Sequence, residues 1–138
     1  MIVQPQSASL IMTGQKLVEA RLGVDRAAPY NRVNPGDAVY IKPSGQAVIG
    51  KAIVHRVDQY SGLTPSDVAH LQRIYNDRVL GDQAFWSSKQ DSTHATFITL
   101  SRVAMISDET SVPASLLTPS HQAWRVLHDE QSHARRAA

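Results

Sequence analysis

Three ionisable side chains lie close together near the N-terminus, in residues 14–21, which read G-Q-K-L-V-E-A-R. The carboxylate of Glu19 can accept hydrogen bonds from the amino groups of a base, and the planar fork of Arg21 can hold a carboxylate or a phosphate. The ammonium of Lys16 can contact phosphate or, if desolvated, act as a base or a nucleophile. The same three residues are equally consistent with a row of solvated charges on the surface, which would contribute little to stability.

A strand must position these charges. Val18, Ala20 and Leu22 recur with a period of two and therefore share one face, which we expect to be buried. Glu19 and Arg21 then project together from the opposite face. Lys16 lies at the start of this half-buried strand, just after a short helix that Gly14 ends, so the three ionisable side chains are predicted to converge at one edge.

The composition describes an ordinary globular domain. The chain has 138 residues, of which 42% are hydrophobic and 19% are charged. It has no cysteine, no apolar run long enough to cross a membrane and no signal-peptide pattern, so we expect a cytoplasmic protein that does not enter a membrane. The net charge is only +2, but residues 1–60 carry seven Lys and Arg against four Asp and Glu, which favours an anion site in that half.

Several kinds of chemistry have no sequence support. The glycines form neither a dinucleotide-binding motif nor a phosphate-binding P-loop, and no G-x-S-x-G motif is present. The six histidines include no H-E-x-x-H and no pair four residues apart. We therefore expect no metal site and no cofactor.

The remaining elements predict an α+β fold, a small mixed β-barrel with helices covering its ends. Gly50, inside a strand, is typical of a bulge or of a close backbone approach. The first half is expected to contain a helix over 7–13, a strand from 17, a loop over 23–35 and strands over 38–42 and 47–57. The second half is expected to contain a helix over 65–79, capped by Thr64 with the acidic Asp67 at its third position, a loop over 85–89, a strand over 94–106 and a final helix from 118 docked by Trp124.

The pattern G-x-K-x-x-E-x-R resembles the signature of the ASCH domain, a branch of the PUA-like fold. It is followed by Pro35-Gly36-Asp37, by Gly50-Lys51-Ala52 and by Phe85-Trp86-x-x-Lys89, and the similarity covers about residues 8–105. The resemblance implies a small β-barrel with a cleft beside the signature, proposed to bind RNA. Some members are amidohydrolases of N4-acylated cytidine, and ribonuclease activity is known for others. It places the domain at 1–110, with a helical extension and a frayed end at 111–138.

The signature falls on Gly14, Lys16, Glu19 and Arg21. The amidohydrolase branch has threonine at the position of Glu19, and it uses a further glutamate from a central region that here, in 61–90, contains none. If this chain hydrolyses such a substrate, the resemblance makes Lys16 the reactive group, with Glu19 as its catalytic neighbour. Asp77 or Asp82 would then carry the proton.

Further candidates for contact with a nucleotide come from three segments. Tyr30 and Asn31 lie in the long polar loop, and Lys51 follows the strand glycine. Trp86 can stack on a base or belong to the core, and Lys89 can reach phosphate or remain solvated.

The favoured hypothesis is a protein that binds single-stranded RNA or a nucleotide-sized fragment through Lys16, Glu19, Arg21 and these candidate residues. The alternatives are an enzyme acting on a modified nucleoside of the N4-acylcytidine type, a ribonuclease, and a module that binds another protein through the final helix. Binding through so modest a net charge should weaken quickly with salt.

Overall fold

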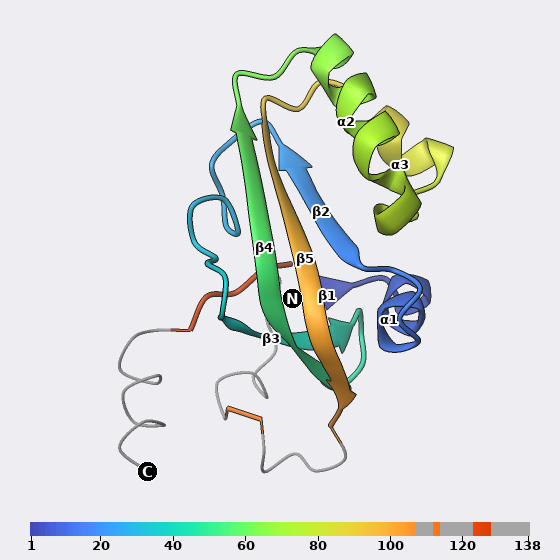
Figure 1. Cartoon of the computed structure of the whole chain (residues 1–138), viewed down its shortest axis with the longest axis vertical. Coiled ribbons are helices and arrows are strands. Elements are labelled where there is room, and N and C mark those ends of the chain that lie inside the picture. The colour runs from blue at the N-terminus through green and yellow to red at the C-terminus, as the bar shows by residue number, and fades with distance from the viewer. Residues whose placement is uncertain (107–111, 114–122, 128–138) are drawn as a thin grey trace.

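The computed structural model describes residues 1–106, 112–113 and 123–127 (Figure 1). Within them the chain forms five strands and three helices. The strands are β1 (Ile2–Val3), β2 (Val18–Gly23), β3 (Ala38–Pro43), β4 (Gly50–Ser61) and β5 (His94–Met105), and the helices are α1 (Pro5–Met12), α2 (Pro65–Val79) and α3 (Gln83–Ser88). The predicted α+β class is confirmed.

The strands form one mixed sheet in the order β1-β3-β4-β5-β2, which curls into a half-barrel. Only the β1–β3 pair is parallel. The long strands β4 and β5 form the centre of the sheet, α2 and α3 lie together near one end of them, and α1 lies nearer the other (Figure 1). The two edges of the sheet are therefore β1 and β2, and the barrel is open between them.

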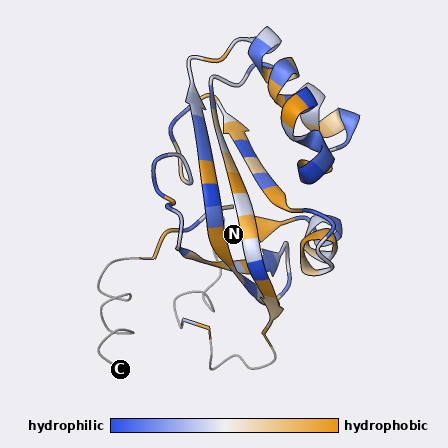
Figure 2. Ribbon diagram, in the orientation of Figure 1, coloured by the Kyte–Doolittle hydropathy of each residue, from blue (hydrophilic) through white to orange (hydrophobic). Residues whose placement is uncertain are grey.

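Two apolar clusters stabilise this sheet. The first gathers α1, β3 and β4 around Ile11, Ile41 and Val54, and the second packs α2 and α3 onto β2 and β5. Hydrophobic and hydrophilic residues alternate along the strands, as a sheet with different environments on its two faces requires (Figure 2). Val18, Ala20 and Leu22 all belong to the second cluster, which confirms the predicted buried face of β2.

Gly50 lies where α1 closes on the sheet. A Cβ atom at this position would lie 2.5 Å from Met12 Sδ and 3.2 Å from the carbonyl oxygen of Ala104. The pairing of β4 with β5 also shifts in register just after it, between Lys51 and Ile53. Of the two alternatives predicted for this glycine, the close approach is confirmed at Gly50 itself, and the irregular pairing begins one residue later.

The two later helices begin at different kinds of cap. Thr64 and Asp67 form a reciprocal capping box at the start of α2, as the sequence predicts. The loop expected over residues 85–89 is wrong, because α3 covers most of it. Asp82 Oδ1 accepts a hydrogen bond from the backbone N–H of Phe85 at 2.8 Å, and this cap starts a helix too short to show a helical period in the sequence.

The C-terminal prediction is only partly within the described residues. Residues 123–127 form a bend and irregular chain, so the helix expected to carry Trp124 is wrong there, and its start near 118 lies outside the described residues. Trp124 packs against the first apolar cluster. The division at residue 110 stays a prediction. No described helix has the length and apolar character needed to cross a membrane.

Candidate functional site

The open side of the half-barrel contains the larger described cavity. The guanidinium of Arg21, on β2, crosses the opening and donates from Nη2 to the carbonyl oxygen of Ile2, on β1, at 2.8 Å. A cavity of about 560 Å³ lies here, between β1, β2, the start of the β3–β4 connection and α3. We call it the seam cleft, because it occupies the line along which the sheet does not close.

Two charged side chains, Glu19 and Arg21, line one wall of the seam cleft, and Lys16 lies against Glu19. Glu19 Oε2 lies 2.8 Å from Arg21 Nη2, and Glu19 Oε1 lies 3.5 Å from Lys16 Nζ. Lys16 and Glu19 are each only 6% exposed. The alternative of a solvated row of charges is therefore wrong, and the predicted convergence of these three residues is confirmed.

Local backbone geometry brings Lys16 to this position. Gly14 has φ of 79°, a left-handed conformation that reverses the chain after α1. The backbone N–H of Lys16 then donates to the carbonyl oxygen of Leu10 at 2.9 Å. The chain thus directs the lysine beneath the C-terminus of α2, where Nζ donates to the carbonyl oxygen of Val79 at 2.5 Å.

The environment of Lys16 disfavours its charged form. Burial lowers its pKa below the ordinary value, the nearby Arg21 lowers it further, and the attraction and hydrogen bond of Glu19 oppose both effects. Lys16 does not itself line the seam cleft, whereas Glu19 and Arg21 do. Lys16 is therefore connected to the cleft through the Glu19 carboxylate.

Two lysines add positive charge to the cleft. Lys42, at the end of β3, and Lys89, after α3, both line it. Lys89 was expected from the sequence, but Lys42 was not. Its place depends on the parallel pairing of β1 with β3, in which Ile2 lies opposite Lys42. The described residues that line the cleft thus include three cations, Arg21, Lys42 and Lys89, and a single carboxylate, Glu19.

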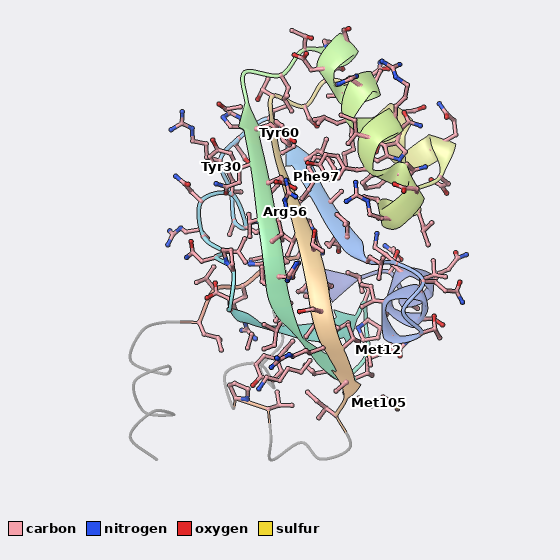
Figure 3. The ribbon with its side chains drawn as sticks, viewed as in Figure 1. Met12, Tyr30, Arg56, Tyr60, Phe97 and Met105 are labelled. Atoms are coloured by element: carbon pink, nitrogen blue, oxygen red, sulfur yellow. The ribbon has the colours of Figure 1, made fainter. Side chains whose placement is uncertain are left out.

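A second, smaller cavity of about 210 Å³ adjoins the first and is lined by the loop after β2 and by β5. Tyr30, on that loop (Figure 3), lines it together with His94. Asn31, the next residue, lines neither cavity. Its backbone N–H donates to Gln59 Oε1 and its Oδ1 accepts from Gln59 Nε2, so it ties the loop to β4.

The other predicted residues lie away from both cavities. Trp86 is 2% exposed in the second apolar cluster, and its Nε1 donates to Asn76 Oδ1 at 2.9 Å. Its indole therefore has no open face for a base and belongs to the core. Lys51 is exposed on β4 with Nζ 5.6 Å from the ring centre of Tyr40, and it lines neither cavity.

The aspartates proposed to carry a proton are also outside the cavities. Asp77 Oδ1 lies 3.4 Å from Arg78 Nε in a surface ion pair. Asp82 caps α3. The acidic residues that line the two cavities are Glu19 in the seam cleft and Asp25 in the smaller one. Among the described residues, no group of three or more His, Cys, Asp or Glu could hold a metal ion.

The curled mixed sheet with its helices is the fold of ASCH domain proteins, as the sequence pattern suggests. The crystal structure of ASCH from Zymomonas mobilis matches with a TM-score of 0.69 and 18% identity, over 99% of this chain and 92% of that one. A serine-to-alanine variant of the same protein matches with a TM-score of 0.69 and 19% identity, over 99% and 92% of the two chains. No protein-family model and no curated sequence matches the chain.

Proposed function

We propose that this protein binds single-stranded RNA, or a nucleotide-sized fragment of it, in the seam cleft. The observation that carries the proposal is the set of charges in the lining of the cleft, which includes Arg21, Lys42 and Lys89 and one buried carboxylate among the described residues. A concave surface with excess positive charge attracts the phosphates of a nucleic acid. The ASCH fold agrees with this proposal.

The wall of the cleft offers two kinds of contact. Arg21 makes both of its described hydrogen bonds through Nη2, and its guanidinium lies over the ring of Trp124, 5.6 Å from the ring centre. Nε and Nη1 donate to no described acceptor, and in this proposal they bind the phosphate. Each oxygen of Glu19 already faces a cation, but a carboxylate oxygen has a second lone pair for the amino group of a base or the hydroxyl of a ribose. Phosphate and base would thus be read side by side.

Two lysines provide a matched test by fluorescence anisotropy with a labelled short RNA. Lys89 Nζ lies 5.7 Å from the ring centre of Phe85 and lines the cleft, whereas Lys51 Nζ lies 5.6 Å from that of Tyr40 and lines neither cavity. We expect Lys89→Ala to weaken binding. The slope of the logarithm of the binding constant against the logarithm of the salt concentration should become shallower by about 0.7, the value for one phosphate contact on a single strand. Lys51→Ala should change neither. Equal effects of the two variants, or no binding of the unmodified protein, would refute the proposal.

A second candidate function rests on Lys16. A buried lysine with a lowered pKa beside a carboxylate is the arrangement that a lysine base needs, and Glu19 connects it to the cleft. This favours hydrolysis of an acylated amine on a cytidine-type nucleoside. The test is release of acetate from N4-acetylcytidine, with cleavage of labelled RNA followed in parallel. Release that Lys16→Met and Glu19→Gln both abolish, in variants shown to be folded, would support this candidate, and no release would refute it.

A further inference from the structure

Arg21 and Lys89 line both cavities. The two spaces are therefore neighbours, and the cations lie at the boundary that they share. Among the described ion pairs, Lys89 takes part in none. An anion at this boundary would be held from both sides, with room for a further group in each direction.

The smaller cavity has walls suited to a flat aromatic group. The rings of Tyr30 and His94 meet at 86° with their centres 5.1 Å apart, and they form one corner of it. Its volume of about 210 Å³ lies below the roughly 300–1,000 Å³ typical of sites for drug-sized ligands, whereas the seam cleft, at about 560 Å³, lies within that range. The smaller cavity therefore suits a single base more than a complete nucleotide.

A buried hydroxyl points to a ligand in the smaller cavity. Thr96 lines the cavity, is 1% exposed, and lies opposite Arg21 in the pairing of β2 with β5, so both side chains project from the same face. Its neighbours Ala95 and Phe97 belong to the second apolar cluster. Within the described part of the chain, the Thr96 hydroxyl has no hydrogen-bond partner. A buried hydroxyl of this kind is normally satisfied, and the edge of a base offers the donor or acceptor that it lacks.

We propose that the two cavities together bind two consecutive nucleotides of a single strand. The linking phosphate lies on Arg21 and Lys89, one base lies against Tyr30 and reaches the Thr96 hydroxyl, and the neighbouring nucleotide occupies the seam cleft. This inference rests on the proposed function and specifies its substrate class. It also gives Tyr30 a role that does not depend on the buried Trp86.

The test is calorimetric titration of the full chain with cytidine monophosphate, a cytidine dinucleotide and a short single-stranded RNA. We expect the dinucleotide to bind more tightly than the monophosphate. Tyr30→Ala should weaken dinucleotide binding about five- to a hundredfold, the range for loss of one stacked base, and Tyr30→Phe should retain it. Thr96→Val should weaken it about two- to tenfold, the range for one hydrogen bond. The matched control is Thr99→Val on the same strand, since Thr99 lines neither cavity.

The outcomes separate this inference from the proposed function. The two-nucleotide site is refuted, with the proposed function intact, if RNA binds but the dinucleotide gains nothing over the monophosphate and the Tyr30 and Thr96 variants bind like the unmodified protein. Absence of binding to all three probes refutes both. A thermal melt of each variant shows that a loss of binding does not come from unfolding.

Discussion

Replacing Glu19 by glutamine tests the buried charges most directly. The substitution keeps the shape of the side chain but removes the negative charge that lies 3.5 Å from Lys16 Nζ and 2.8 Å from Arg21 Nη2. Lys16 and Arg21 would then lose the negative charge that they share. Because Lys16 is only 6% exposed, solvent cannot replace that partner for it.

The expected loss can be worked from this geometry. Removing one partner of a buried ion pair costs about 3–5 kcal/mol. Arg21 is partly exposed and the glutamine oxygen can still accept from it, so we expect the lower end, about 3 kcal/mol. For a chain of this length, about 4 °C per kcal/mol gives a fall in Tm of about 12 °C. Lys16 can limit the loss further by releasing its proton, because the attraction that opposes the lowering of its pKa would be gone.

Urea unfolding at neutral pH, followed by circular dichroism, measures this loss. Asp77→Asn is the control, because it removes the carboxylate of the exposed Arg78–Asp77 pair and should leave the unfolding free energy nearly unchanged. A loss for Glu19→Gln as small as that of the control would contradict the expected contribution of the buried Lys16–Glu19–Arg21 ion pairs.

Three further predictions concern the elements around the cleft. The lowered pKa of Lys16 means that, as pH rises toward its ordinary value of 10.5, the folded protein loses this proton before the unfolded chain does. The unfolding free energy of the unmodified protein, relative to that of Lys16→Met, should therefore increase over that range. Urea titrations of both proteins at several alkaline pH values measure this difference, and a difference that stays flat or falls would contradict the prediction. Asp82→Ala removes the cap of α3 and should cost about 1 kcal/mol in urea unfolding, and it should weaken RNA binding, since α3 positions Lys89. Gly50→Ala should lower stability only slightly, by about 1 kcal/mol, because the flexible end of Met12 can move aside and the remaining tight contact is the carbonyl oxygen of Ala104 at 3.2 Å; a loss of about 3 kcal/mol would contradict this.

Local patterns in the sequence predicted much of the fold. The alternation along β2 identified its buried face, and the capping residues Thr64 and Asp67 identified the start of α2. Both signals depend on residues close together in the chain. The helix α3 was not predicted, because its six residues are too few to show a helical period. Its cap at Asp82 was the one available signal.

The candidate site was predictable only in part, for a related reason. Lys16, Glu19 and Arg21 lie within six positions of one another. Strand geometry predicts that Glu19 and Arg21 share a face, and the turn at Gly14 places Lys16 at the start of the strand. Lys42 enters the cleft through a pairing of β1 with β3 that joins residues 40 positions apart. Thr96 reaches the smaller cavity through its pairing with Arg21 on β2. Such contacts are properties of the tertiary fold, and no local pattern carries them.

The open side of the half-barrel also bears on how copies of this chain behave toward one another. An uncovered sheet edge can pair with a strand of another molecule and so lead to aggregation. Here the edge strand β1 has only two residues, and the backbone groups of Ile2 are occupied, the N–H by the carbonyl oxygen of Ala123 at 2.7 Å and the carbonyl oxygen by Arg21. The other edge, β2, carries the charged Glu19 and Arg21, which oppose the docking of a foreign strand. Arg21 thus occupies a carbonyl of the β1 edge as well as lining the cleft that is proposed to bind RNA.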